Sequence, residues 1–240
     1  MTIREWHEEI ESLRPSIVRL STPQGSGTGF LLSVSATRPL VAIATAAHVV
    51  EHAHYWEQPI RVDHIESGAS ILLRHADRAI LINSGRDSAA IIFEKQDLPL
   101  PPVPLGLIER NYHMKPGVEV GWLGFPAIPR ASLSFFSGRI SAWLEEEQAY
   151  LVDGVAINGV SGGPAFRPGL KAPEVIGVVS AYIPNRNTGE ALPGLAVIRD
   201  VEEFHGVTDR MRSLDEAQAE QTPPGDAPPP VAGETPARAS

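Results

Sequence analysis

The protein has 240 residues, with 20 basic and 29 acidic side chains and a formal net charge of −9 at pH 7. An acidic chain without a cluster of Lys and Arg lacks the electrostatic pattern of nucleic-acid or membrane-surface binding, so we expect neither partner. Hydrophobic residues make up 42% of the chain, enough for a real core, and with no cysteine that core has to act without disulfides.

The first 15 residues differ from a signal peptide, because they carry acidic side chains where a signal peptide would be basic. No apolar run of the chain approaches the roughly 18 residues of a membrane span. We therefore expect a cytoplasmic protein. Within this segment apolar residues recur every three or four positions, which predicts a short amphipathic helix over residues 1–14, ended by Pro15.

Two β-rich halves follow. The 21 glycines and 22 prolines favour many short strands joined by turns. Strand-like runs of the first half, residues 15–97, are SIVRL, GTGFLLSV, PLVAIATA, SILLRH, AILIN and AAIIF. Those of the second half, residues 107–199, are VEVGWLGF, LSFFSGRISAW, AYLVDGV, EVIGVVSAYI and GLAVI. Residues 98–106 hold four prolines and predict an extended connector, so the halves form two barrels or sandwiches packed side by side.

The end of the chain divides into a helix and a tail. Residues 200–213 predict a closing helix with Asp200 as its N-cap, although Gly206 weakens the pattern. Residues 214–240 are rich in proline and have almost no large apolar side chain. Such a segment cannot bury enough surface to offset its ordering entropy, which predicts a disordered tail.

The run Gly159-Val160-Ser161-Gly162-Gly163-Pro164 has the composition of a nucleophile turn. Acyl transfer needs a serine oxygen exposed at a tight turn, with free backbone N–H groups nearby for the developing oxyanion. A glycine two residues before the serine lets the N–H groups of Gly159 and Ser161 converge. Gly-Ser runs also form plain loops, so this run alone does not decide the function.

His48 follows an apolar strand at a predicted strand-to-helix junction and is flanked by small residues. That context distinguishes it from His52 and His54, which lie on a more polar continuation. These two could suggest a metal, but no third or fourth ligand accompanies them, and we expect neither metal nor cofactor.

Asp87 heads the apolar run Ser88–Phe93, where a carboxylate can be buried beside a histidine. Such a carboxylate fixes the tautomer of a histidine base and stabilises its charged form. Asp63, Asp77 and Asp97 compete for this role, but none precedes so apolar a run.

Together, the three segments resemble the trypsin-like (chymotrypsin-fold) serine peptidases, in which histidine, aspartate and serine follow in this order. Further runs resemble the HtrA-type bacterial branch: GSGTGF at 25–30, GFP at 124–126, GRIS at 138–141, VVSAY at 178–182 and GLAVI at 194–198. The resemblance covers about residues 15–205, without a PDZ-like domain after it. It implies an all-β fold of two packed six-stranded β-barrels with the site between them and short terminal helices.

The resemblance also implies a serine endopeptidase that hydrolyses protein or peptide substrates. Ser161 would attack the peptide carbonyl, His48 would transfer the proton, and Asp87 would orient His48. The N–H groups of Gly159 and Ser161 would form the oxyanion hole.

The same resemblance predicts how the substrate is held. Ser180, Ala181, Tyr182 and Gly194 would line the substrate site, and Val155 would form the base of the pocket for the residue before the cleaved bond, P1. An apolar base cannot pair with Arg or Lys, which predicts an uncharged P1 residue. If the alignment slips by one residue, Asp153 comes closer to this pocket and reverses the preference.

One departure from secreted trypsins concerns activation. Val160 stands where those enzymes carry the aspartate that pairs with a new N-terminus after cleavage. The protein then needs another restraint, such as a narrow substrate range or a regulatory partner protein. The alternatives are a catalytically silent fold that binds peptides or proteins, whose expected mark is a lost triad residue, and an unrelated β-rich protein.

Overall fold

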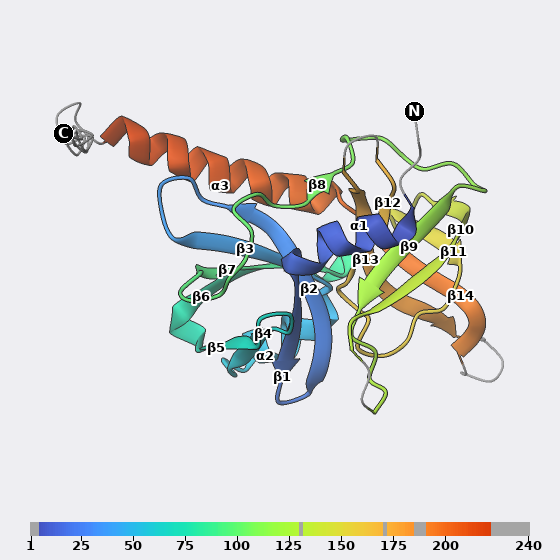
Figure 1. Ribbon diagram of the computed structural model, residues 1–240, viewed down its shortest axis with the longest axis horizontal. Coiled ribbons are helices and arrows are strands. Elements are labelled where there is room, and N and C mark those ends of the chain that lie inside the picture. Colours follow the sequence, from blue (N-terminus) through green and yellow to red (C-terminus); the bar gives the residue numbers. More distant parts are fainter. Residues whose placement is uncertain (1–4, 130–131, 170–171, 185–190, 222–240) are drawn as a thin grey trace, which may run out of the picture.

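The computed structural model describes residues 5–129, 132–169, 172–184 and 191–221. These residues form two β-sheets and three α-helices, with the sheets packed side by side (Figure 1). The prediction of an all-β fold with two barrel-like halves is confirmed. None of the helices in these ranges is long and apolar enough to cross a membrane.

The first sheet is antiparallel throughout and has the strand order β5-β4-β1-β2-β3-β7-β6. Its strands are β1 (Ile17–Thr22), β2 (Gly25–Val34), β3 (Leu40–Thr45), β4 (Ile60–His64), β5 (Ala69–Leu73), β6 (Arg78–Asn83) and β7 (Ser88–Glu94). Its end strands β5 and β6 do not pair with each other in this sheet, so it forms a half-barrel.

The second sheet closes into a six-stranded barrel, β12-β9-β10-β11-β14-β13, because β12 also pairs with β13. Its strands are β9 (Glu119–Gly124), β10 (Ser134–Leu144), β11 (Ala149–Asp153), β12 (Pro164–Arg167), β13 (Glu174–Pro184) and β14 (Ala191–Asp200). A short strand, β8 (Gly106–Leu107), follows the Pro-rich connector and adds to β13 in parallel. The connector thus ends as an edge of the second sheet.

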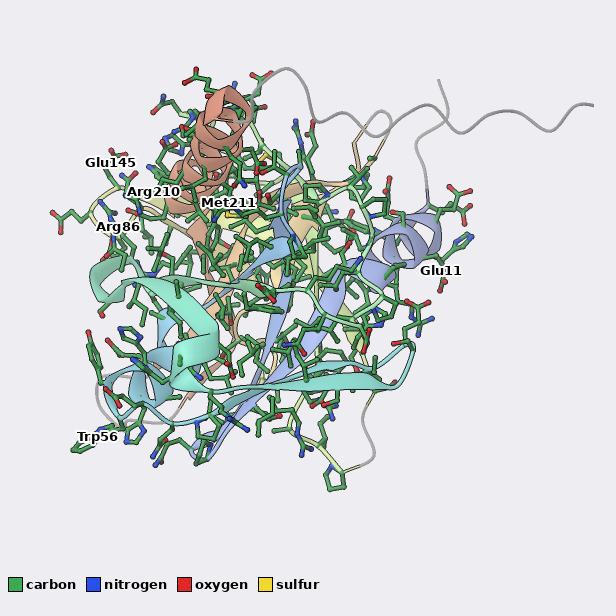
Figure 2. The ribbon with its side chains drawn as sticks, turned by 90° about the vertical axis from the view of Figure 1, so that its left-hand side faces the viewer. Glu11, Trp56, Arg86, Glu145, Arg210 and Met211 are labelled. Carbon is green, nitrogen blue, oxygen red and sulfur yellow. The ribbon has the colours of Figure 1, made fainter. Side chains whose placement is uncertain are left out.

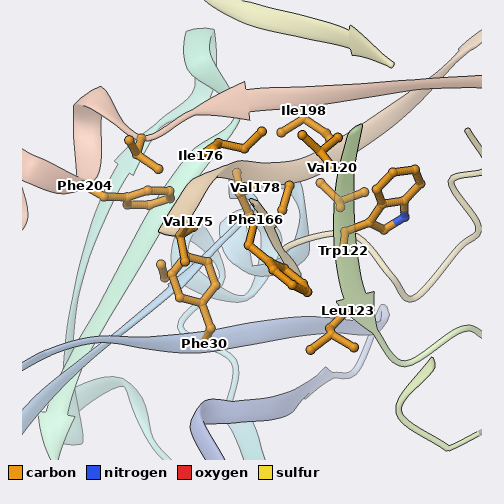
Figure 3. Packing of buried hydrophobic residues seen from close by; sticks show 14 of the residues in the cluster. Phe30, Val120, Trp122, Leu123, Phe166, Val175, Ile176, Val178, Ile198 and Phe204 are labelled. Atoms are coloured by element: carbon orange, nitrogen blue, oxygen red, sulfur yellow. The ribbon is translucent and has the colours of Figure 1, made fainter. Parts of the chain in front are cut away.

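The core of the second barrel continues into the interface between the sheets. Phe30 of β2 is fully buried and belongs to the same apolar cluster as Trp122 and Phe166 of the second barrel. Figure 3 shows Phe30 beside Val175 and near Phe204. Its neighbour Leu31 instead packs inside the first sheet. The middle of strand β2 is therefore buried on both faces, which explains why Phe30, Leu31 and Leu32 follow one another without a polar residue.

The N-terminal helix α1 (Trp6–Leu13) precedes the first sheet in the chain but packs on the second barrel. The ring of Trp6 lies 5.2 Å from that of Phe135 and 5.7 Å from that of Phe166, measured between centroids. The predicted helix over 1–14 thus appears as eight residues plus a 3₁₀ turn at Arg14–Ser16, and residues 1–4 lie outside the described ranges.

The closing helix α3 (Glu202–Gln221) is longer than predicted. It starts two residues after Asp200, whose side chain accepts a hydrogen bond from the N–H of Glu202 at 3.3 Å. It runs along the first sheet and reaches the β2–β3 turn (Figure 1). Residues 214–221, predicted to begin the disordered tail, are therefore helical, and residues 222–240 lie outside the described ranges.

Polar contacts between helix α3 and the β2–β3 loop, here called the polar clamp, explain why residues 214–221 are helical. The carboxylate of Asp215 accepts hydrogen bonds from the hydroxyls of Ser35 and Thr37 and from the N–H of Ala36. One turn further along α3, Gln218 accepts a hydrogen bond from Arg38 of the same loop. Polar contacts of this kind leave no apolar pattern in the sequence, so composition alone did not reveal them.

We expect Asp215→Asn to lower the melting temperature at neutral pH by about 2–4 °C, the shift that loss of ~1 kcal/mol produces in a domain of this size. Hydrogen bonds from Ser35 and Ala36 lower the pKa of Asp215 from 3.8 to about 2. A carboxylate with a lowered pKa stabilises the fold above its unfolded pKa, and this contribution is lost as the pH falls through the folded value.

The difference between wild type and Asp215→Asn should therefore shrink between pH 4 and pH 2, as thermal melts across this range would show. Glu216→Gln removes a neighbouring charge that takes no part in the clamp, and should leave the melting temperature within a degree or so of wild type. Equal melting of wild type and Asp215→Asn at pH 7 would contradict the clamp.

Candidate active site

His48 lies at the start of helix α2 (Ala47–Tyr55), directly after strand β3. The small, buried side chains of Ala46 and Ala47 allow the helix to begin tight against the sheet. The imidazole Nδ1 lies 2.9 Å from Oδ2 and 3.0 Å from Oδ1 of Asp87, and the main-chain N–H of His48 donates to Oδ1 at 3.0 Å. The ring nitrogen and the main-chain N–H of His48 thus both contact one carboxylate, while 48% of the histidine side chain remains exposed.

Asp87 joins a 3₁₀ turn, Ser84–Arg86, to strand β7. Its backbone is left-handed, with φ 46° and ψ 43°, a conformation that Asp and Asn adopt more readily than other non-glycine residues. The side chain of Asn83 caps the turn by accepting a hydrogen bond from the N–H of Arg86 at 3.2 Å. The turn thereby places the carboxylate beside the start of α2.

The surroundings of Asp87 lower its pKa. Burial by itself would raise the pKa, because it disfavours the charged form. Hydrogen bonds from His48 and Ser180, together with the charge of a protonated His48, outweigh this effect. The carboxylate therefore stays ionised at neutral pH and can orient the imidazole and stabilise its protonated form.

Ser180, on strand β13, has a role that the sequence did not indicate. We predicted it as part of the substrate site, but its buried hydroxyl donates a hydrogen bond to Oδ2 of Asp87. Its carbonyl accepts a hydrogen bond from Oγ of Ser161 at 3.3 Å. One feature of the sequence could have indicated this role: Ser180 carries a hydroxyl inside an apolar strand. A buried hydroxyl needs a hydrogen-bond partner.

The hydroxyl of Ser161 is oriented toward Ser180, and it makes no hydrogen bond to His48 among the described residues. To transfer its proton to Nε2 of His48, the hydroxyl has to rotate away from the Ser180 carbonyl. Hydroxyl groups reorient readily, and catalytic hydrogen bonds are often long or absent before substrate binds.

The turn before Ser161 leaves two N–H groups free. Neither the N–H of Gly159 nor that of Ser161 donates to an acceptor within the described ranges. Gly159 has φ 89°, and a Cβ there would lie 2.4 Å from the carbonyl oxygen of Phe125. Only glycine fits this position, as the sequence argument required.

The orientation of these two N–H groups is set by the carbonyls that share their peptide planes, since N–H and C=O point in opposite directions in a trans peptide. For the first N–H, the carbonyl of Asn158 accepts a hydrogen bond from Ala127 at 2.7 Å. For the second, the carbonyl of Val160 accepts one from Gly163 at 3.0 Å. The turn thus holds in place, beside the serine, two donors that have no acceptor among the described residues, as an oxyanion hole requires.

The other predicted substrate residues lie on three neighbouring segments. Ala181 and Tyr182 belong to β13, where their main chain pairs with β14, and their side chains lie outside the described part of the structure. The carbonyl of Gly194 accepts a hydrogen bond from the N–H of Gly154 at 2.8 Å. This bond brings β14 next to Val155, which is 49% exposed.

The competing acids lie elsewhere. Asp63 accepts a hydrogen bond from Ser70 at 2.6 Å, and Asp77 accepts one from the N–H of Arg74 at 2.9 Å. The structure therefore brings only Asp87, of the four candidates, into hydrogen-bond contact with His48.

The two histidines considered for a metal lie further along α2. His52 pairs with Gln58 at 3.2 Å, and His54 packs on Tyr55. Trp56, at the end of this helix, projects from the edge of the molecule (Figure 2). Within the described ranges, no three His, Cys, Asp or Glu side chains are grouped to hold a metal ion.

A cavity of about 600 Å³ lies between strands β6 and β7 and helix α3. It is lined by Leu81, Ala90 and Phe204 and bordered by Arg110 and Arg210, and none of the three residues of the predicted triad lines it. The serine, the histidine and the aspartate of the predicted triad therefore lie outside this cavity.

Many solved structures are similar to the chain, and three of them illustrate the likeness. They are Deg5 (19% identity, TM-score 0.60, covering 85% of this chain and 94% of that chain), the inactive form of Rv3671c from M. tuberculosis H37Rv (19%, 0.57, 85% and 90%) and the serine endoprotease from Yersinia pestis (17%, 0.61, 88% and 68%). At these identities the likeness shows the fold, which is that of serine proteases.

No curated protein sequence matches the chain. The sequence profile of the trypsin-like peptidase domain matches residues 27–178, which include the histidine, the aspartate and the serine described above. The resemblance drawn from the sequence motifs is therefore confirmed, and the chain belongs to the family of trypsin-like peptidase domains.

Proposed function

We propose that the protein is a serine endopeptidase with Ser161 as nucleophile, His48 as base and Asp87 as the acid that orients it. The observation that carries the proposal is the imidazole held by a mostly buried, ionised carboxylate at 2.9 Å, across from a serine turn with two unpaired N–H groups. The peptidase family implies protein substrates. The mechanism needs no metal or cofactor.

In this mechanism, Oγ of Ser161 attacks the peptide carbonyl carbon while His48 Nε2 takes the hydroxyl proton. The resulting oxyanion accepts hydrogen bonds from the N–H groups of Gly159 and Ser161. The C–N bond then breaks as His48 gives the proton to the leaving amine. Water hydrolyses the acyl-enzyme by the same steps, with His48 again as base and then as acid, and the serine is restored.

Val160 supports the idea that the turn forms without zymogen cleavage. Its side chain is fully buried in the apolar cluster between the sheets, and its N–H donates to the carbonyl of Ile157 at 3.0 Å. Packing here takes the place of an ion pair to a new N-terminus. Restraint of the enzyme would then come from a narrow substrate range or from a regulatory partner protein.

A fluorophosphonate probe, which reacts only with an activated serine, tests the proposed function. The wild-type chain should be labelled on Ser161, and Ser161→Ala should remain unlabelled. Ser70→Ala serves as the control, since this serine bonds to Asp63 on the β4–β5 hairpin, outside the site. A folded wild type that is not labelled would favour the alternative, a catalytically silent fold that binds peptides.

The proposed specificity is testable with peptides that vary only at P1. If Val155 forms the base of the pocket, kcat/KM should be highest for Val, Ala or Leu, because a buried cationic side chain would lack a partner. Introducing an acid by Val155→Asp should shift the preference toward Arg and Lys. If the wild type already prefers Arg or Lys, Asp153 reaches the pocket, and Asp153→Asn should then abolish that preference.

A further inference from the structure

Thr28, on strand β2 of the first sheet, is fully buried and hydrogen-bonded at every polar group. Its main-chain N–H donates to the carbonyl of Ser161 at 2.8 Å, and its hydroxyl donates to the carbonyl of Gly159 at 2.8 Å. The same hydroxyl accepts the N–H of Phe125 at 3.0 Å, and the Thr28 carbonyl accepts the hydroxyl of Thr45 at 2.7 Å. One residue thus contacts the nucleophile turn twice.

These bonds satisfy two carbonyls of the turn, those of Gly159 and Ser161, for which the described part of the second barrel supplies no donor. The outer peptide planes of residues 158–161 are fixed within the second barrel, by Ala127 and Gly163. The carbonyl between them, that of Gly159, accepts its hydrogen bond from Thr28. Among the described residues, Thr28 is the one residue of the first sheet with hydrogen bonds to residues 158–161.

The surroundings of Thr28 leave little space for adjustment. A Cβ at Gly162 would lie 2.1 Å from the Thr28 carbonyl oxygen, and a Cβ at Gly124 would lie 3.0 Å from the Thr28 hydroxyl. Thr45, which bonds to the Thr28 carbonyl, ends the strand that leads into His48. Thr28 therefore links the segment before the proposed base with the turn of the proposed nucleophile.

We propose that Thr28 is a positioning residue that keeps the N–H groups of Gly159 and Ser161 directed at the oxyanion. This inference rests on the proposed peptidase function and adds a determinant of its transition-state binding. Without the hydroxyl, the buried Gly159 carbonyl and the Phe125 N–H each lose a partner, which is costly in a site that excludes water. Among the described residues, the peptide between Gly159 and Val160 then keeps one hydrogen bond, from its N–H to the Ile157 carbonyl. The loosened peptide disturbs the direction of the neighbouring N–H groups.

The kinetic test uses Thr28→Val, which keeps the shape and removes the hydroxyl, and Thr28→Ser, which keeps the hydroxyl. Loss of a complete oxyanion donor lowers kcat by about 10²–10³. Two donors that remain but are misdirected should therefore lower kcat on the order of 10- to 100-fold. We expect Thr28→Val to lower kcat and the affinity for a peptide boronate by similar factors, with KM within about threefold of wild type.

Thr28→Ser should return both quantities to near the wild-type values. The matched control is Thr208→Val, which removes a hydroxyl-to-carbonyl hydrogen bond of 2.8 Å in helix α3 and should change neither kcat nor boronate affinity. A merely structural role for Thr28 would lower the melting temperature without separating kcat from KM. If Thr28→Val does not fold, Thr28→Cys, with a weak donor of similar size, replaces it.

A second measurement does not depend on activity. The amide exchange of Val160, followed by NMR, should be at least tenfold faster in Thr28→Val than in wild type or Thr208→Val, because the loosened peptide includes this N–H. Unchanged exchange together with unchanged boronate affinity would overturn the role of Thr28. A wild type that neither cleaves peptides nor binds the boronate would instead reject the peptidase function, and the exchange rate would still decide whether Thr28 holds the turn.

Discussion

Replacing Ser161 or His48 by alanine is expected to lower peptidase kcat by about 10⁶ in each case, because the members of a serine triad act as a unit. Without Ser161 no acyl-enzyme forms, and without His48 the serine proton has no acceptor. The double variant should be little slower than either single variant, since each substitution already removes the covalent route. Single-turnover cleavage of a peptide substrate, with the three variants purified in parallel, measures these ratios.

The thermal stability of the Ser161→Ala and His48→Ala variants is the control for this loss of activity. The side chain of Ser161 makes one hydrogen bond, at 3.3 Å, and His48 is half exposed, so neither substitution removes core packing. Melting temperatures should therefore stay within a few degrees of wild type. A Ser161→Ala variant that keeps more than about a thousandth of wild-type activity would contradict the assignment of the nucleophile, because the loss expected for a triad serine is far larger.

The motifs, through their resemblance to trypsin-like peptidases, were sufficient to predict that His48 and Asp87 lie together. His48 and Asp87 are 39 residues apart; His48 follows β3 and Asp87 precedes β7, and these two strands pair with each other. Each strand is an apolar run followed or preceded by a polar residue, and such runs are readable from sequence. The contact between the two side chains follows once the strands are neighbours.

Three strands were missed: the two-residue β8, which ends the predicted connector, and β4 and β12, which were missed for different reasons. In β4 the buried Ile60, Val62 and His64 alternate with Arg61 and Asp63, so a true period-two pattern was hidden by its charged residues. Strand β12 directly follows the nucleophile turn and begins with a proline, which argues against a strand in sequence analysis. Its four residues close the second barrel by pairing on both sides.

The sequence could not predict which groups the side chains of Ser180 and Thr28 contact. Ser180 appears in the sequence as one hydroxyl within an apolar run and Thr28 as one of two hydroxyls in the run GSGTGF, and nothing local tells which distant group each hydroxyl contacts. Their partners lie 93 and 131 residues away, at Asp87 and Gly159. Such contacts depend on the packing of one sheet against the other, which no periodicity encodes.

Asp87→Asn is expected to lower kcat by about 10⁴ at neutral pH while leaving the fold intact. The asparagine amide presents an N–H₂ group to Nδ1 of His48, which favours the tautomer with the proton on Nε2. That nitrogen can then no longer accept the serine proton. The fold should persist because asparagine tolerates the left-handed backbone at this position, φ 46°, nearly as well as aspartate does.

The pH dependence separates this effect from a general loss of stability. Because the pKa of Asp87 is lowered in the folded protein, its charge stabilises the fold above the unfolded value of 3.8 and ceases to do so as the pH falls through the folded value. Wild type and Asp87→Asn should thus differ in stability at neutral pH and converge only below about pH 4, whereas the loss of kcat is present wherever the wild type is active. Asp63→Asn removes a carboxylate bonded only to Ser70, so it should change neither quantity appreciably. Activity of Asp87→Asn within tenfold of wild type would mean that His48 is oriented by its position on α2 alone, and that Asp87 is not part of the catalytic unit.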